Sequence, residues 1–287
     1  MSDLGILPPP IVLDPLLQSW LLEDIGRGDR TTQGLFLEKT GDVRAEWIAK
    51  EEGVIVGLPI AARVFQLLDA NSRFTPLVKE GDVCHSGMAI AKLEGSVEAL
   101  LTGERVALNL AMHLSGIATL TRKYTDKIAD FAAKLVDTRK TTPGLRILEK
   151  YATQLGGAIN HRMGLDDAVM IKDNHIAAAG GIGKAISLIR KTIPYPLTIE
   201  VETETLEQVK EALQYQADII MLDNMSVEMM REAVGIIRSN DSHVKIEASG
   251  NITLETIRAV AETGVDYIST SAPITQSKWL DLSMKMF

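Results

Sequence analysis

The chain has 287 residues, of which 46% are hydrophobic and 24% charged, and its formal net charge is −8 at pH 7. This length suits one large α/β barrel or two domains with separate cores, and the negative charge excludes a general attraction for nucleic acid or an anionic membrane. A single cysteine, Cys84, excludes an internal disulfide framework, and no apolar run reaches the roughly 18–20 residues that span a bilayer, so we expect a cytoplasmic protein.

The N-terminal region is predicted to contain helices followed by a small α+β region. Within residues 1–40, leucines and Trp20 recur at helical spacing before glycines break the pattern, which predicts helix, turn and helix. Residues 41–100 hold strand-like segments separated by glycine turns, with a helix predicted at 59–70.

A long helical pattern then covers most of residues 96–131. Ser115–Gly116 is the predicted break in this helix, because glycine weakens a helix interior. We therefore expect a domain boundary at this position.

The remainder of the chain alternates between short apolar runs and amphipathic helix candidates. This alternation is typical of βα units with a parallel sheet. Six units in a row favour a closed or nearly closed α/β barrel, and a doubly wound sheet is the second possibility. No G-x-G-x-x-G follows a strand, which is modest evidence against a dinucleotide-binding fold. The predicted strands are residues 134–137, 168–171, 197–202, 218–222, 244–248 and 265–269.

Each predicted strand ends in, or carries near its end, polar residues, and the segment before the second strand adds three more. In α/β barrels the active site lies at the carboxyl ends of the strands, so these residues predict a functional site there. The residues are Asp137, Thr138, Arg139 and Lys140; Asn160, His161 and Arg162; Lys172, Asp173, Asn174 and His175; Glu200 and Glu202; Asp223 and Asn224; Glu247, Ser249, Gly250 and Asn251; and Ser269, Thr270 and Ser271.

These strand ends divide by charge. The basic members are Arg139, Lys140, His161, Arg162 and Lys172. Such a cluster binds carboxylates or phosphates, and arginine contributes bidentate contacts. The acidic members are Glu200, Glu202, Asp223 and Glu247. Carboxylates that face a shared cavity hold Mg²⁺ together with substrate phosphates. The residues therefore predict an enzyme that uses carboxylate- and phosphate-bearing substrates with Mg²⁺.

Two details refine this prediction. Strand alternation places Glu200 and Glu202 on one face, and Glu202 lies nearer the mouth, so it is the better metal candidate. The turns "EASGN" and "STSAP" consist of small residues, whose exposed backbone N–H groups suit a phosphate.

Long motifs in both halves of the chain resemble one enzyme family. They are "EDIGRGDRTT" and "GERVALNLAMHLSGIATLT" in the first half, then "DTRKTTPGLRILEKYA", "GGAINHRMGLDDAVMIKDNHI", "IEVET", "MLDN" and "EASGNI". From about residue 20 to its last residue, the sequence resembles quinolinate phosphoribosyltransferase, also called nicotinate-nucleotide pyrophosphorylase (carboxylating).

The resemblance implies a reaction, a fold and an assembly. Quinolinate and phosphoribosyl pyrophosphate (PRPP) would give nicotinate mononucleotide, pyrophosphate and CO₂ with Mg²⁺, a step of NAD biosynthesis. Residues 1–115 would form an N-terminal α/β sandwich that makes the dimer contact, 116–273 an open α/β barrel that carries catalysis, and 274–287 a segment that returns to the N-terminal domain. The protein would be a homodimer or larger, with each active site shared between subunits.

The resemblance also implies residue roles. Arg139, His161, Arg162 and Lys172 match the positions that bind the carboxylates, Lys140 a position near the phosphoribosyl donor, and Arg105 an arginine from the neighbouring subunit. Ser249 and Gly250 match the 5′-phosphate turn, and Thr138 and Ser271 are further substrate-binding candidates. Glu202 and Asp223 would hold Mg²⁺ and, with Lys140 and Lys172, are the catalytic candidates. The chain departs from the family pattern at Ser271, where glycine is usual, and at Gln276, where histidine is usual.

Several alternatives stay open from the residues. Lys172 could be the Schiff-base lysine of an aldolase, the protein could bind an anionic metabolite without turnover, or it could be a molybdenum-operon relative that uses another nucleophile. His175 could cap the next turn rather than act in a site, and Glu200 and Glu247 could pair with cationic side chains inside the barrel instead of binding metal.

Overall fold

The computed structural model describes residues 6–36 and 41–287, which form two compact units. Unit 1 contains the chain up to Arg122 together with Ile147–Gly156 and Gln276–Phe287. Unit 2 contains Lys123–Arg146 and Gly157–Thr275. Among the described residues, no helix is long and apolar enough to cross a membrane.

Unit 1 combines helices with an antiparallel sheet. The helices are α1 (Pro10–Ile25), α2 (Arg30–Leu35) and α3 (Leu58–Leu68), and the sheet has the order β12-β1-β5-β3, from β12 (Leu282–Met286), β1 (Asp42–Ala49), β5 (Ala89–Ser96) and β3 (Arg73–Pro76). A smaller pair joins β2 (Gly53–Val54) and β4 (Val83–Cys84). The predicted helix, turn and helix and the α+β region are confirmed, except that residues 1–5 and 37–40 lie outside the described residues.

Three aromatic rings form the centre of unit 1. Trp47 of β1 is fully buried, and its ring meets those of Phe65 from α3 and Phe74 from β3 edge-on, at centroid distances of 6.4 and 5.3 Å. Alternate residues of β1 are buried, as expected for a strand with one face on a core. The last strand, β12, pairs antiparallel with β1, so the end of the chain completes the sheet that the first strand began.

The predicted break at Ser115–Gly116 is wrong. Helix α4 (Val97–Lys127) runs through this pair without interruption, and the boundary between the compact units falls later in the same helix, after Arg122. Both residues serve packing: a Cβ on Gly116 would overlap the backbone oxygen of Lys278. The buried Ser115 hydroxyl accepts from the Val56 N–H at 2.9 Å and bonds the Val56 carbonyl at 3.1 Å. Small residues here permit close approach rather than ending the helix.

Unit 2 contains the predicted parallel sheet. Its strands have the order β6-β11-β10-β9-β8-β7, and all their pairings are parallel. They are β6 (Lys134–Val136), β7 (Val169–Ile171), β8 (Ile199–Thr203), β9 (Ile219–Asp223), β10 (Lys245–Ser249) and β11 (Tyr267–Ser269), which confirms the predicted strands.

The strand order identifies the architecture of unit 2 as an open barrel. From β7 to β11 the order in space follows the order in sequence, and the first strand, β6, then pairs with the last. A doubly wound sheet would instead reverse direction at a switch point. The barrel is open because β6 and β7 do not pair, although a single parallel bridge joins Val136 to Ile159 near this opening.

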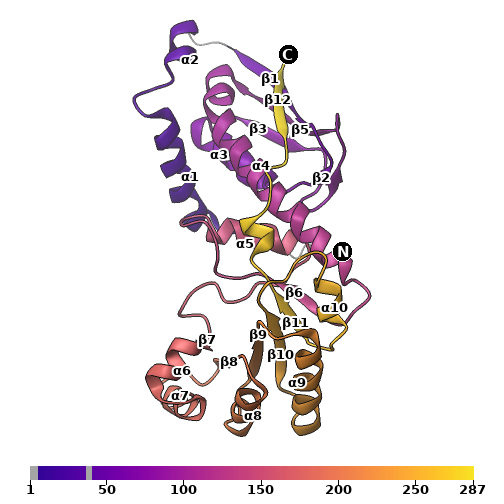
Figure 1. The fold of residues 1–287 in the computed structure, drawn as a ribbon. Coiled ribbons are helices and arrows are strands. Elements are labelled where there is room, and N and C mark those ends of the chain that lie inside the picture. The colour runs from indigo at the N-terminus through magenta and orange to yellow at the C-terminus, as the bar shows by residue number, and fades with distance from the viewer. Residues whose placement is uncertain (1–5, 37–40) are drawn as a thin grey trace. The chain divides into compact units, whose positions relative to one another are not determined.

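Helices connect these strands. Helices α6 (Asp173–Ala179), α7 (Ile182–Ile189), α8 (Leu206–Gln214) and α9 (Val227–Asn240) contact one another in sequence and form the row at the lower edge of Figure 1. The shorter α10 (Ile257–Ala261) and α11 (Ala272–Thr275) follow, while α5 (Arg146–Leu155) belongs mostly to unit 1.

Helix α6 was not predicted, because its first residues were interpreted as a polar strand end. The backbone N–H of Lys172 donates to Nδ1 of His175 at 3.0 Å, which satisfies a backbone group at the helix start. This favours the capping role among the two readings of His175.

Replacing Gly116 by alanine should lower the free energy of unfolding by about 1–3 kcal/mol, because the new methyl group collides with backbone rather than with a movable side chain. Urea unfolding would measure the change. Gly235→Ala in α9 is the matched control, since its Cβ meets no atom within 4 Å, and alanine should stabilise that helix by about 0.5–1 kcal/mol. Equal effects of the two substitutions would contradict the packing role of Gly116.

Candidate active site

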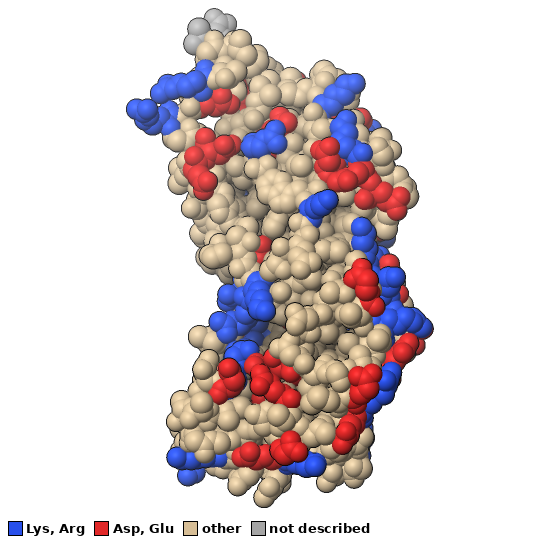
Figure 2. Space-filling view, in the orientation of Figure 1, with Lys and Arg blue, Asp and Glu red and all other residues tan. Residues whose placement is uncertain are grey.

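The parallel sheet of unit 2 brings the predicted polar residues to one edge. Residues that end or follow β6 to β11 all emerge at the carboxyl ends of the strands. Figure 2 shows lysine and arginine side chains gathered directly beside acidic ones on one face of the molecule. Arg105 is exposed on α4 in unit 1, so it is not among the groups that this sheet gathers.

A cavity of about 240 Å³ opens among the basic members of this set. It is lined by Thr138, Arg139, Lys140, His161, Arg162, Met170 and Lys172. Six of these were predicted as substrate-binding or catalytic residues, and Met170 was missed. Its signal was available, because Met170 in β7 lies two positions before Lys172, and alternate residues of an extended segment share a face.

Two arginines crowd this cavity. The Nε of Arg139 is buried and has no hydrogen-bond partner among the residues that the structure describes. Nη1 of Arg162 donates to the Ala168 carbonyl at 2.7 Å. Burial, followed by the positive charge of Arg139, lowers the pKa of the Arg162 guanidinium. Two guanidinium groups close together, one of them with a buried N–H that lacks an acceptor, cost free energy that a bound anion would offset. Such a pair of guanidinium groups suits a carboxylate or phosphate.

His161 is held in one protonation state by its neighbours. Asp137, at the end of β6, accepts from the His161 N–H at 2.8 Å and from Asn160 Nδ2 at 2.6 Å, which fixes this segment beside the sheet. Nδ1 of His161 accepts from the Arg162 N–H at 2.7 Å, so Nδ1 carries no proton. The imidazole is therefore neutral, with its proton on Nε2.

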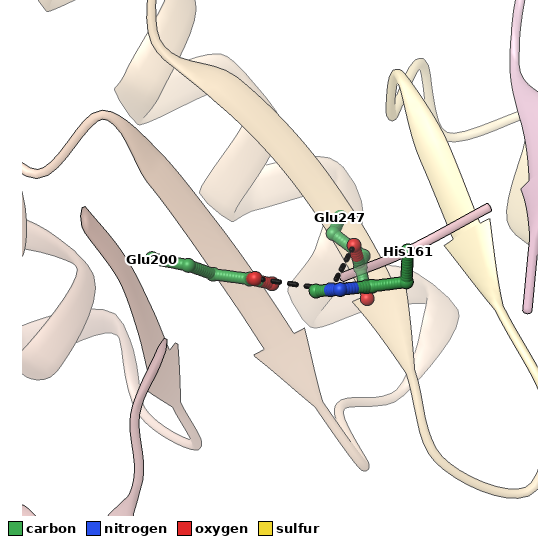
Figure 3. Close-up of side chains that lie close together, drawn as sticks. All are labelled: His161, Glu200 and Glu247. Carbon is green, nitrogen blue, oxygen red and sulfur yellow. Dashed lines mark ion pairs between the residues drawn. The ribbon is translucent and has the colours of Figure 1, made fainter. Parts of the chain in front are cut away.

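The Nε2 proton of His161 faces two buried carboxyl groups, as Figure 3 shows. Nε2 lies 3.1 Å from Oε2 of Glu200 and 3.6 Å from Oε2 of Glu247. Burial and the nearby charge of Glu200 raise the pKa of Glu247 to about 8, so Glu247 is mostly protonated at neutral pH. The three ligand atoms lie within 4.8 Å of one another, close enough for a metal ion as well.

The remaining acidic candidates lie nearer the mouth. Oε2 of Glu202 accepts from the Lys172 ammonium at 2.7 Å, and Lys172 remains 46% exposed. Asp223, at the end of the neighbouring strand, is half-buried and accepts from Asn224 Nδ2 at 2.6 Å. Glu200 and Glu202, which alternation placed on one face, thus have different partners. Oxygen donors on adjacent strand ends suit a hard cation such as Mg²⁺.

The predicted phosphate-binding turns follow β10 and β11. Ser249 ends β10, and Gly250 has φ +91°, a conformation that favours glycine. Ser271 precedes α11, and its carbonyl accepts from the N–H groups of Ile274 and Thr275 at 3.0 and 2.9 Å. Both turns therefore lie at the same edge of the sheet as the charged residues.

Comparison with known proteins identifies relatives over nearly the whole chain. Residues 29–115 match the family model for the N-terminal domain of quinolinate phosphoribosyl transferase, and residues 117–285 match its C-terminal domain. A protein of Synechocystis sp. described as a probable nicotinate-nucleotide pyrophosphorylase (carboxylating) is 60% identical, and the match covers 99% of this chain and 96% of that protein. A Bacillus subtilis protein of the same description is 48% identical over 95% and 92% of the two chains.

Solved structures agree with these matches. The crystal structure of NadC from Streptococcus pyogenes is similar with a TM-score of 0.93 and 43% identity, covering 99% of both chains. The nicotinate-nucleotide pyrophosphorylase from Francisella tularensis has a TM-score of 0.92 and 40% identity, covering 100% of both chains.

The raised pKa of Glu247 predicts how stability depends on pH. The folded protein keeps a proton on Glu247 up to about pH 8, whereas the unfolded chain releases it near the ordinary glutamate value of 4.5. The stabilisation that protonated Glu247 contributes is therefore complete below pH 4.5, and it is lost as the pH rises from 4.5 to about 8. Glu247→Gln removes this dependence. Within that pH window, the free energy of unfolding of the variant should therefore rise relative to that of the wild type by up to about 1.4 kcal/mol per pH unit.

Urea unfolding followed by circular dichroism across this pH range would measure the difference. Glu232→Gln, which changes an exposed carboxylate on α9, is the matched control and should leave the pH slope unchanged. A constant offset between Glu247→Gln and the wild type at every pH would contradict the protonated state of Glu247.

Proposed function

The chain belongs to the quinolinate phosphoribosyltransferase family, and on that premise we propose how the edge of the unit 2 sheet performs the reaction. The enzyme transfers the phosphoribosyl group of PRPP to quinolinate and releases pyrophosphate and CO₂, giving nicotinate mononucleotide. We propose that quinolinate occupies the cavity of about 240 Å³ and that PRPP lies across the strand ends beside it.

The observation that carries this proposal is the crowded arginine pair. Quinolinate has two adjacent carboxylates, and the cavity offers the unused, buried N–H of Arg139 beside the charge of Arg162. A dianion relieves the repulsion between the two guanidiniums and supplies the missing acceptor. The neutral His161 adds an imidazole to the cavity wall, while its Nε2 proton stays with Glu200.

The chemistry depends on positioning and charge. The pyridine nitrogen attacks C1 of the ribose as the bond to pyrophosphate breaks, and the electron pair of that bond leaves with pyrophosphate. The ring nitrogen is then cationic, so it stabilises the electron pair that stays on the ring when CO₂ departs. That carbon takes up a proton to complete the product. Lys140 and Lys172 lie on the cavity wall, where their charges would stabilise the anionic donor.

Mg²⁺ fits the oxygen donors at the mouth. Glu202 already has a cation, the Lys172 ammonium, at 2.7 Å, and Asp223 follows on the neighbouring strand. We propose that Glu202 and Asp223 hold Mg²⁺. When bound, Mg²⁺ would neutralise charge on the departing pyrophosphate. Ser249, Gly250 and Ser271 are proposed to receive the 5′-phosphate of PRPP.

The assembly and location are further proposals. Arg105 is exposed on unit 1, which fits the expectation that it reaches the site of a neighbouring subunit in a homodimer or larger assembly. A cytoplasmic location stays a prediction that rests on the single cysteine and on the charged substrates.

The competing functions have less support. Nζ of Lys172 is engaged by Oε2 of Glu202 at 2.7 Å, whereas a Schiff-base lysine needs a free amine to attack a carbonyl carbon. A binder without turnover leaves the acidic strand ends unexplained. The relatives reported above carry the carboxylating description rather than that of a molybdenum-operon protein.

Incubation with quinolinate, PRPP and Mg²⁺ should release CO₂ and nicotinate mononucleotide in equal amounts. Arg139→Lys should lower kcat/KM for quinolinate on the order of 10- to 100-fold, because lysine keeps the charge but loses the planar pair of donors. Arg190→Lys is the matched control, since Arg190 pairs with Asp218 at 3.0 Å and is not one of the residues that line the cavity. Unchanged kinetics in Arg139→Lys would contradict the carboxylate site.

Mixing Arg105→Ala and Lys172→Ala proteins tests the shared site. Each variant alone should be inactive or nearly so. After subunit exchange, roughly a quarter of all sites should regain activity, because half of the dimers are hybrid and one of their two sites carries neither substitution. Exchange is verified by native mass spectrometry, and exchange without recovered activity would show that Arg105 does not act across subunits.

A further inference from the structure

Two neighbouring strand ends are joined by a contact that the proposed roles leave unexplained. In the parallel register of β9 and β10, Asp223 lies opposite Ser249. The next residue, Asn224, donates its backbone N–H to the Ser249 carbonyl at 3.0 Å. Asn224 thus directly follows the metal candidate Asp223, and its backbone bonds to Ser249, the first residue of the phosphate turn.

The side chain of Asn224 makes a second connection between these strand ends. Its Nδ2 donates to Oδ2 of Asp223 at 2.6 Å, and its Oδ1 accepts from Nδ2 of Asn251 at 3.0 Å. The NH₂ group of the amide faces Asp223, since the amide nitrogen donates hydrogen bonds and a carboxylate oxygen accepts them. The donors in the chain from Asn251 through Asn224 therefore all point toward the Asp223 carboxylate, and successive bonds of this kind polarise one another.

The backbone around this amide leaves little room for another arrangement. Asn224 and Asn251 both have φ +53°, a left-handed conformation that asparagine tolerates better than most residues. A Cβ on Gly250 would overlap Oδ1 of Asn224 and would lie 2.6 Å from its Cγ and 2.9 Å from its backbone nitrogen. The glycine therefore lets the phosphate turn close directly onto the Asn224 amide.

We propose that Asn224 is a positioning residue that holds the Asp223 carboxylate at a fixed place relative to the Ser249–Asn251 turn. PRPP carries phosphate at both ends of its ribose, so the parts of the site that bind the diphosphate and the 5′-phosphate must keep a fixed separation. The inference rests on the proposed function, because it takes Asp223 and this turn to bind opposite ends of that donor.

The variants Asn224→Asp and Asn224→Gly distinguish the contribution of the Asn224 side-chain amide from that of its backbone conformation. Aspartate keeps the shape and tolerates the left-handed backbone, but it puts a carboxylate against Asp223 and cannot donate to it when ionised. Glycine keeps the backbone and removes both side-chain bonds. Asn240→Asp is the control for added charge, since Asn240 ends α9 and its side chain bonds only to the Ile236 carbonyl among the contacts of the described residues.

Calorimetric titration would measure the binding of PRPP with Mg²⁺, and of quinolinate alone, to each purified protein. Asn224→Asp should weaken donor binding on the order of 10- to 100-fold and Asn224→Gly about 3- to 10-fold. Quinolinate binding and the urea midpoint should stay near the wild type in both variants, and Asn240→Asp should change neither ligand. In the assay, KM for PRPP and the Mg²⁺ requirement should rise more than KM for quinolinate.

Two results would overturn the inference alone. One is donor binding at the wild-type level in Asn224→Asp. The other is an equal loss of both ligands with a lowered urea midpoint, which would mean that Asn224 only supports the fold. A wild-type protein that fails to bind PRPP would instead overturn the proposed function, and the inference with it.

Discussion

Parallel pairing forces every strand of unit 2 to end at the same edge of the sheet, and the site depends on this constraint. Residues far apart in sequence meet there because each strand contributes the residues that follow it. The segment that carries His161 joins the same edge because Asp137 binds its backbone and side chains at the end of β6. The chemistry of the site is therefore assembled from separate short segments rather than from one motif.

The strand order also separates the charges of the site. The residues that line the cavity follow β6, lie in the segment between β6 and β7, or lie in or directly after β7. These are the two strands that border the opening of the barrel. The carboxyl groups come from β8, β9 and β10, in the paired part of the sheet. Positive charge thus collects where the barrel is open and an anion can enter, while Glu200 and Glu247 are buried where neighbouring strands exclude water.

Sequence patterns predicted correctly the features that depend on residues close together in the chain. The apolar runs gave the strands of unit 2, and their polar ends gave the residues around the cavity. Where a tertiary contact overrides the local pattern, prediction failed. Gly116 looks like a helix break, yet it allows close approach of the Lys278 backbone. The pairing of His161 with Glu200 depends on where Asp137 holds a distant segment, so no spacing in the sequence encodes it. Asp173 starts a helix although its neighbours are polar, because His175 satisfies the Lys172 N–H.

The pairing of β12 with β1 affects the order in which the units mature during synthesis on the ribosome. Domains usually fold in the order in which they emerge, the N-terminal one first. Here the sheet of unit 1 lacks an edge strand until Leu282–Met286 is made, after all of unit 2. Until then, β1 presents unpaired backbone groups, which are a template for association with other chains. Nascent unit 1 therefore stays incomplete while unit 2 is synthesised and folds, so rapid folding of unit 2 shortens the period of exposure.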